Sequence, residues 1–139
     1  MRIRPFEEDD QGTVIELWRR CGLLRPQNDP VKDIARKLKV QRELFLIGDI
    51  DGQIVTSVMA SYDWHRCWVN YLAVDPDHQR KGLGRQIMGE VERLVRERGC
   101  PKINLQVLTT NTAVIAFYKS IGFAIDDVTS MGKRLEFDQ

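Results

Sequence analysis

Residues 71–85 read YLAVDPDHQRKGLGR, and this stretch decides the fold. Its apolar beginning predicts a buried strand, and the glycines Gly82 and Gly84 open a long amphipathic helix that runs to about residue 98. The first N–H groups of a helix are unpaired and carry partial positive charge, so they bind anions. Glycine lets an anion approach the backbone, and Arg80, Lys81 and Arg85 add positive charge around the helix start. The pattern predicts a diphosphate-binding loop.

Two other phosphate-binding motifs fail at single positions. A dinucleotide fingerprint G-x-G-x-x-G requires glycine three residues after Gly84, where the chain has Ile87. The spacing of Gly84 and Gly89 fits a P-loop, but Glu90 stands where that motif has lysine, and a carboxylate there repels phosphates. NAD and ATP are therefore excluded, and the remaining alternative is a tight strand-to-helix turn without a ligand.

The composition is that of an ordinary globular protein. The 139 residues fit one domain, 42% of them are apolar, and the formal net charge is +1. A charge this close to zero argues against a dedicated nucleic-acid-binding protein. The N-terminus has no apolar signal-peptide core, and no apolar run approaches the ~20 residues of a membrane span. We therefore expect one domain over residues 1–139, with no nucleic-acid or membrane partner.

Cysteine and histidine usage indicates a reducing compartment. The three cysteines are far apart and form no C-x-x-C pair, so a disulfide framework is not expected. The two histidines show no metal-ligand spacing. We expect a cytoplasmic protein without a metal site.

The rest of the chain alternates between strand and helix patterns. Strands are predicted over residues 1–4, 44–49, 53–62, 68–74, 102–108, 123–128 and 130–137, and helices over 9–20, 30–40, 83–98 and 111–121. The order β-α-α-β-β-β-α-β-α-β-β requires a mixed, mostly antiparallel sheet flanked by helices, which is an α/β (α+β) domain. The last two strands are expected to pair with each other and can leave an edge for a homodimer.

Two sequence blocks carry a family resemblance. The first joins LAVDP at 72–76 to Q-x-x-G-x-G at 79–84, and the second reads NTAVIAFYKSIGF at 111–123. Together with the element order of the whole chain, they make the sequence resemble the GNAT superfamily of N-acetyltransferases. The stretches LLRPQNDP at 23–30 and GCPKI at 99–103 make it most similar to the small bacterial YpeA-like acetyltransferases. The resemblance implies a single-domain GNAT fold.

The resemblance also implies the reaction and its co-substrate. Acetyl-CoA would donate its acetyl group to a primary amine of a small molecule or a peptide, by direct attack in a ternary complex. A backbone N–H at a bulge in the fourth strand would polarise the thioester carbonyl. The implied cofactor-binding residues are Leu72, Ala73, Val74, Gln79, Arg80, Lys81, Gly82, Leu83, Gly84, Arg85 and Asn111.

Tyr118 is the residue that the resemblance assigns as the general acid. A phenol is protonated at neutral pH and can donate its proton to the departing thiolate. Tyr118 lies seven residues after Asn111, which is two helical turns, so the two side chains are expected on one helix face. The alternative is a tyrosine that only packs beside Phe117.

The general base is not identified by the sequence. Relatives that acetylate ribosomal protein N-termini carry a glutamate five residues before the asparagine of the second block, where this chain has Gln106, which cannot accept a proton. The remaining candidates are Asp63, His65, Glu16 and Tyr71. Each tryptophan, Trp18, Trp64 and Trp68, fits a core position better than a substrate-binding wall.

Three functions stay open at this point. The first is acetyl transfer to a small-molecule or peptide amine. The second is an acyl-CoA binding or sensing module without catalysis, which the missing base keeps open. The third is a protein lysine or N-terminal acetyltransferase, for which no charged docking tail is present.

Overall fold

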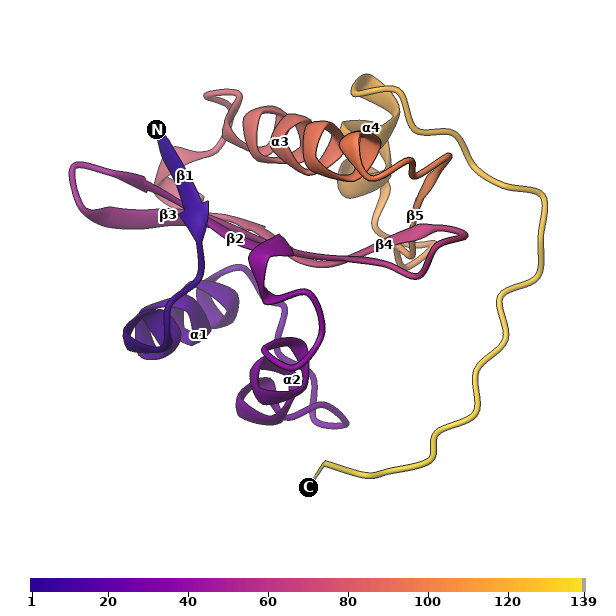
Figure 1. Ribbon diagram of the computed structural model, residues 1–139, viewed down its shortest axis with the longest axis horizontal. Helices are drawn as coiled ribbons and strands as arrows, with labels where there is room; N and C mark the ends of the chain where they lie inside the picture. The colour runs from indigo at the N-terminus through magenta and orange to yellow at the C-terminus, as the bar shows by residue number, and fades with distance from the viewer. Residues whose placement is uncertain (139) are drawn as a thin grey trace.

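The computed structural model describes residues 1–138 and consists of one five-stranded sheet between two pairs of helices (Figure 1). The strands are β1 (Arg2–Pro5), β2 (Phe45–Ile50), β3 (Gln53–Tyr62), β4 (Cys67–Val74) and β5 (Ile103–Leu105). The α-helices are α1 (Gln11–Arg20), α2 (Pro30–Lys37), α3 (Leu83–Glu97) and α4 (Thr112–Ser120). Three short 3-10 helices are η1 (Glu8–Asp10), η2 (Arg42–Leu44) and η3 (Pro76–His78).

The sheet has the order β1-β2-β3-β4-β5, and only its last pair is parallel. Asp51 and Gly52 connect β2 to β3 with φ angles of 52° and 82°, as a two-residue hairpin turn requires. The crossover from β4 to β5 passes through α3, because parallel strands cannot be joined by a tight turn. The expected α/β class with a mixed, mostly antiparallel sheet is confirmed.

Each face of the sheet carries its own apolar cluster. Alternate residues of β2 point to opposite faces, so Leu46 belongs to one cluster and Phe45 and Ile47 belong to the other. Figure 1 shows α3 and α4 on one side of the sheet and α1 and α2 on the other. Ile87 of α3 is buried in the first cluster, and Trp18 of α1 is buried in the second.

The two strands expected after α4 are not formed within residues 1–138. Residues 124–138, here called the C-terminal arm, run as an extended chain from α4 past β5 to α2 (Figure 1). Near β5 the arm is held by side chains, since Lys102 Nζ and Asn104 Nδ2 both donate to Asp126 Oδ2 at 2.8 and 2.9 Å. The arm is therefore attached to β5 by side-chain hydrogen bonds and not by the backbone hydrogen bonds that define a paired strand. The expected strand over 102–108 is likewise shortened to β5.

Several local expectations are confirmed and others are corrected. Asp29 caps α2, because its Oδ1 accepts hydrogen bonds from the next helical N–H groups at 2.9 and 3.3 Å. The helix expected to residue 40 ends at Lys37, and the one expected from residue 9 begins as η1. Trp18 is fully buried, but Trp64 and Trp68 are 82% and 40% exposed, so the core position expected for them is wrong.

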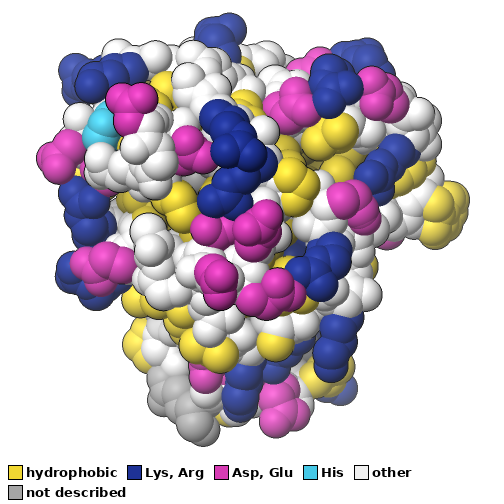
Figure 2. Space-filling model, turned by 60° about the vertical axis from the view of Figure 1, so that its left-hand side comes forward, with side chains coloured by type: hydrophobic (Ala, Val, Ile, Leu, Met, Phe, Trp, Pro, Cys, Tyr) yellow, Lys and Arg dark blue, Asp and Glu magenta, His cyan; other side chains and the backbone are white. Residues whose placement is uncertain are grey.

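The structure of residues 1–138 also bears on membrane spans, metal sites, disulfides and surface charge. Within residues 1–138, no helix is long and apolar enough to cross a membrane. In the same range no group of three or more His, Cys, Asp or Glu side chains could hold a metal ion. The three cysteines are free. Figure 2 shows basic and acidic side chains interspersed on the face it presents, without a large field of one sign.

Candidate active site

A β-bulge interrupts β4 where the sequence expects the donor of the carbonyl hydrogen bond. Asn70 pairs with Met59 and Ala73 pairs with Ser57, so two residues of β4, Tyr71 and Leu72, face one residue of β3. Tyr71 has φ = 54°, a left-handed conformation that is uncommon for residues other than glycine. The bulge changes the direction in which the backbone N–H and C=O groups of the following residues point.

The parallel pairing of β4 with β5 ends just before this bulge. It comprises three residue pairs, the last of which joins Val69 to Leu105. Beyond Val69 the two strands diverge, and the backbone of residues 72–74 has no β5 partner on that side. An extended molecule can pair with such an edge as an additional strand would.

The loop after β4 is fixed by a buried carboxylate. Asp75 is 2% exposed and accepts two hydrogen bonds from the Arg20 guanidinium of α1, at 2.7 and 3.2 Å. Burial raises the pKa of Asp75, but the bonds from Arg20 and from the Asp77 N–H outweigh it, so the pKa lies below its usual value. Gln79 Nε2 also donates to the Val74 carbonyl at 3.3 Å. The ionised carboxylate therefore holds the loop against α1.

The loop leads into a helix start whose N–H groups are not capped by a side chain. Gly82 is the N-cap of α3, with φ = 78° and no side chain to accept a bond. Arg80 is exposed beside it in a left-handed conformation, with φ = 65°, and Lys81 is exposed as well. Unpaired N–H groups and two exposed cations around a glycine are the features of a backbone site that can bind an anion.

Helix α4 packs directly against this helix start. Gly84 lies under the ring of Phe117, because a Cβ at Gly84 would come within 2.9 Å of Phe117 Cζ. Arg85 Nη2 donates to the Ser120 carbonyl at the end of α4, at 3.0 Å. The two sequence blocks, separated by the 26 residues 85–110, therefore meet in space.

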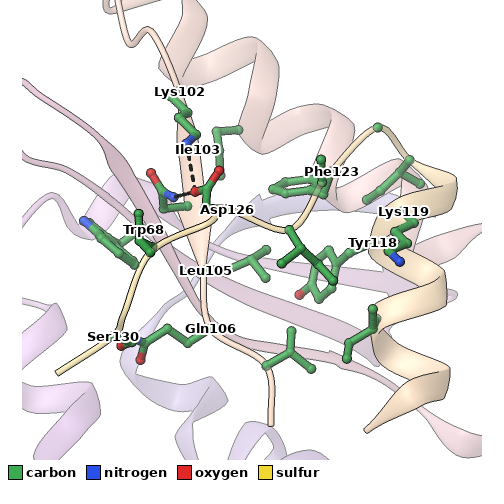
Figure 3. Close-up of a pocket in the computed structure, with 18 of the residues that line it drawn as sticks. Trp68, Lys102, Ile103, Leu105, Gln106, Tyr118, Lys119, Phe123, Asp126 and Ser130 are labelled. Atoms are coloured by element: carbon green, nitrogen blue, oxygen red, sulfur yellow. Dashed lines mark hydrogen bonds and ion pairs between the residues drawn. The ribbon is translucent and has the colours of Figure 1, made fainter. Parts of the chain in front are cut away.

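Tyr118 occupies the inner face of α4, and Asn111 begins that helix. Asn111 Oδ1 accepts a hydrogen bond from the Val114 N–H at 3.2 Å and so is the N-cap, while the side chain stays exposed. Tyr118 is 8% exposed, and its ring makes an edge contact with Phe123 at 5.3 Å. Burial raises the pKa of Tyr118 to about 12. Figure 3 shows its ring pointing from α4 toward β5.

The four candidate bases are scattered. Asp63 lies in the loop before β4, accepts bonds from the N–H groups of His65 and Arg66, and has a pKa lowered by them. Glu16 is exposed on α1 and pairs with Arg19 there. Asp63 lies at the other end of β4 from the loop that follows that strand, whereas Glu16 lies one helical turn before Arg20, which bonds Asp75 in the loop.

Tyr71 is also poorly suited to accept a proton. Its hydroxyl donates to Asp33 Oδ2 at 2.6 Å, and burial together with that bond raises its pKa above the usual value. Gln106 donates from its side-chain amide to Ser130 in the C-terminal arm (Figure 3). The structure therefore brings together the loop, the end of β4 and α4, but no obvious base.

Sequence reasoning missed the contacts that position these elements. Arg20 anchors Asp75 across 55 residues, and Asp33 bonds Tyr71 across 38 residues. The only signal for the first was an aspartate in the turn before proline, and for the second there was none.

Comparison with known proteins agrees with this geometry. A family model described as the acetyltransferase (GNAT) family matches residues 8–123. An acetyltransferase of Yersinia pseudotuberculosis is 45% identical over 139 residues, covering 100% of this chain and 99% of its own. The crystal structure of Ard1 from Thermoplasma volcanium is 27% identical with a TM-score of 0.78, over 90% of this chain and 83% of that one. The ribosomal-protein-S18-alanine N-acetyltransferase from Escherichia coli is 25% identical with a TM-score of 0.74, over 87% and 76%.

The sheet that splits after β4, followed by a glycine loop at a helix start, defines an acetyltransferase of the GNAT class. The chain belongs to the acetyltransferase (GNAT) family, and it is similar over its full length to bacterial proteins named acetyltransferases.

Proposed function

We propose that this enzyme transfers the acetyl group of acetyl-CoA to a primary amine of a small molecule or a peptide. One observation carries the proposal: the unpaired edge of β4 after the bulge is followed, after the loop that Asp75 fixes, by the uncapped start of α3. A ligand with an extended amide-bearing arm and a diphosphate matches both parts at once. Coenzyme A has this construction.

The cofactor is proposed to bind in two sections. Its diphosphate would take the N–H groups at the start of α3, with the cations of the loop around it. Its pantetheine arm would pair with the backbone of β4 beyond the bulge. The residues assigned to these roles are Leu72, Ala73, Val74, Gln79, Arg80, Lys81, Gly82, Leu83, Gly84 and Arg85, with Asn111 at the start of α4.

Tyr118 is proposed to protonate the leaving thiolate. Its raised pKa keeps the hydroxyl protonated throughout the neutral range, as an acid requires. The amine attacks the thioester carbon, the C–S bond breaks, and the sulfur takes the phenolic proton. A backbone N–H of the bulged strand would hold the carbonyl oxygen as negative charge develops on it, a contribution of ~3 kcal/mol in comparable sites.

The acceptor amine must lose a proton, and we assign that step to water rather than to a side chain. Gln106 cannot accept a proton, and its amide is already bonded to Ser130. This difference argues against the reaction named for the Escherichia coli S18-alanine acetyltransferase, despite the shared fold. A small-molecule or peptide amine is the acceptor we favour.

Three further properties belong to the proposal. We propose that residues 1–139 form a single acetyltransferase domain, since both faces of its sheet are covered by its own helices. A cytoplasmic location fits the three free thiols. A homodimer fits the apolar side chains that the C-terminal arm exposes.

A coenzyme A release assay tests the function. The purified chain is given acetyl-CoA with amines, polyamines, amino acids and peptides in turn, and free thiol is measured. Turnover with at least one class of amine is the expected result. Tight coenzyme A binding without turnover would replace the proposal with an acyl-CoA sensor, which the missing base favours. Turnover restricted to folded proteins would indicate a protein acetyltransferase.

A further inference from the structure

The end of helix α1 is attached to the point where β4 ends. Cys21 Sγ donates to the Val74 carbonyl at 3.2 Å, and Arg20 donates to both carboxylate oxygens of Asp75, at 2.7 and 3.2 Å. Arg20 Nη2 also donates to Asp77 Oδ2 at 3.2 Å. Figure 1 shows α1 and α3 on opposite faces of the sheet. These bonds therefore connect the loop that leads into α3 with a helix of the other face.

Asp75 in turn orders the loop that follows it. Its side chain accepts a hydrogen bond from the Asp77 N–H at 2.8 Å and so caps η3, and its carbonyl accepts one from the His78 N–H, also at 2.8 Å. Gln79 Nε2 folds back to the Val74 carbonyl at 3.3 Å. The residues that lead into α3 follow directly after these bonds. The position of the glycine loop therefore depends on where Asp75 is held.

The Asp75 carboxylate depends on Arg20 for its buried position. The Asp75 side chain is 3% exposed, whereas the side chain of Arg20 is 34% exposed and that of Asp77 is 81% exposed. An ionised carboxylate with so little access to water is stable only when it is paired and hydrogen-bonded. Without the guanidinium, the carboxylate would be left buried with an uncompensated charge, and it would gain free energy by turning toward water. The loop that it caps would then lose its anchor.

We propose that Arg20 is a positioning residue, which holds the diphosphate-binding loop in place and so sets the affinity for coenzyme A without touching the cofactor. This role rests on the proposed function, because it requires a diphosphate at the start of α3. A loop that is ordered before binding loses less conformational entropy when its ligand arrives. Arg20 also neutralises Asp75 and Asp77, two carboxylates of the same loop that would otherwise repel a diphosphate. The pantetheine arm would pair with β4 instead, so the effect of Arg20 is confined to the diphosphate end of the cofactor.

Binding of two ligands separates this role from general support of the fold. Calorimetry measures the dissociation constant of coenzyme A, and an NMR chemical-shift titration measures that of pantetheine, which lacks the diphosphate and the nucleotide. Both titrations are done at high salt, which screens long-range charge effects. We expect Arg20→Ala to raise the dissociation constant of coenzyme A about tenfold and to leave that of pantetheine within about twofold. Arg20→Lys keeps a cation opposite Asp75 but not the two-pronged contact, so its affinity for coenzyme A should fall between those of Arg20→Ala and the wild type.

Two further variants serve as controls. Arg19 precedes Arg20 in the last turn of α1 and pairs with Glu16 of the same helix. Arg19→Ala therefore removes the same charge and should leave both dissociation constants unchanged. The double variant Arg20→Met/Asp75→Asn removes the buried charge together with its partner, so it should fold even where Arg20→Ala is unstable. It still lacks the anchor and should bind coenzyme A as weakly as Arg20→Ala.

The possible failures are distinguishable. An unchanged dissociation constant of coenzyme A in Arg20→Ala, or an equal rise for coenzyme A and pantetheine, would overturn the role of Arg20. The wild type tests the proposed function itself. If the wild type binds pantetheine as tightly as coenzyme A, the start of α3 holds no diphosphate, and the diphosphate site and the role of Arg20 both fail. If the wild type prefers coenzyme A and Arg20→Ala keeps that preference, only the role of Arg20 fails.

Discussion

Tyr71 and Asp33 are joined by a 2.6 Å hydrogen bond from the phenol to the carboxylate, which connects the bulge of β4 to helix α2. The Tyr71 ring also stacks on Trp18 with its centroid 3.9 Å away. The residue with the least favourable backbone conformation in the sheet is therefore held from two helices. Its side chain compensates for the strain of its φ angle.

Removing this hydroxyl should destabilise the protein. We expect Tyr71→Phe to lower the free energy of unfolding by about 1–3 kcal/mol, because the half-buried carboxylate of Asp33 loses one of its two side-chain donors and keeps only Arg36. Urea denaturation measures the change. The control is Tyr62→Phe, which removes a 3.0 Å bond to the Trp64 carbonyl at a solvent-accessible site and should cost less than about 1 kcal/mol. Equal losses for both variants would contradict the role assigned to Asp33.

Tyr118→Phe should slow turnover without weakening cofactor binding. If the phenol donates the proton to the thiolate, kcat should fall by about 10²–10⁴, while the coenzyme A dissociation constant stays within about twofold. Steady-state kinetics and calorimetry separate the two quantities, and Tyr62→Phe is again the control. An unchanged kcat would leave Tyr118 only a packing role against Phe123.

The pH profile gives a second test of the same residue. The pKa of Tyr118 is about 12, so its hydroxyl stays protonated up to at least pH 10. The wild-type kcat should therefore show no decline between pH 8 and about pH 10 from loss of the acid. A decline in this range that disappears in Tyr118→Phe would contradict the raised pKa.

Reversing a charge in the loop should weaken coenzyme A binding. Arg80 is exposed at the start of α3, and Arg80→Glu would place a carboxylate beside the proposed diphosphate. We expect the dissociation constant to rise several-fold, up to about tenfold, at low salt and less at high salt. Arg96→Glu makes the same charge change in the last turn of α3 and should have no comparable effect. Equal affinities for both variants would indicate that Arg80 is only a solvated surface residue.

Two glycines of α3 should respond oppositely to alanine. At Gly84 a Cβ would meet Phe117 Cζ at 2.9 Å, so Gly84→Ala should cost about 1–3 kcal/mol by forcing α4 to move. At Gly89 a Cβ meets nothing within 4 Å, so Gly89→Ala should stabilise the helix by about 0.5–1 kcal/mol. Thermal and urea unfolding measure the sign and the size of both changes in the free energy of unfolding. The loss at Gly84 should shrink when Phe117→Leu shortens the opposing ring, and a persistent loss would point to another cause.

Because Lys37 is buried, the free energy of unfolding should depend on pH in the alkaline range. Lys37 is 7% exposed, and burial lowers its pKa to about 8, although Nζ donates to the Val40 carbonyl and to Ser61 Oγ. In the unfolded chain its pKa is about 10.4, so the unfolded state binds more protons between pH 8 and 10.4 and stability rises with pH there. Below pH 8 the cost of burying the charge is fully present.

The variant Lys37→Met isolates this effect. Its gain in unfolding free energy over the wild type should be greatest at pH 7 and smaller at pH 10, because only the wild type loses the buried charge. Urea denaturation of both proteins at the two pH values measures the difference. The same gain at both pH values would show that the pKa of Lys37 is not lowered and that Lys37 stays charged in the fold.

The elements that the sequence predicts well are those determined locally. β3 has the predicted bounds, Asp29 caps α2 as expected, and the glycine loop lies at the start of α3. Each depends on residues within one turn or one strand. The bulge of β4 is implied only by the family resemblance, and local patterns do not indicate it, because Trp18 and Asp33 hold Tyr71 from other parts of the chain.

The last two predicted strands are not formed in the described part of the chain, for a different reason. Alternating apolar residues around Leu135 indicate a segment able to pair, and the pattern is present. Pairing also needs a free backbone edge within reach, and the ion pair of Asp138 with Arg36 fixes the end of the arm on α2. Hydrophobic periodicity does not specify which edge, or which chain, supplies the partner.

The two apolar clusters lie on opposite faces of the sheet, and this separation affects how proteins with this fold can evolve. Ile87 and Tyr118 pack with the helices beside the glycine loop, whereas Trp18 and Ile34 pack with the helices on the other face. Substitutions in α1 and α2 can accumulate without disturbing the packing of α3 and α4, provided that Trp18, Arg20 and Asp33, which hold the bulge of β4 and the loop after it, are kept. A lineage with this architecture can therefore vary most of one face of the sheet while inheriting the other face almost intact.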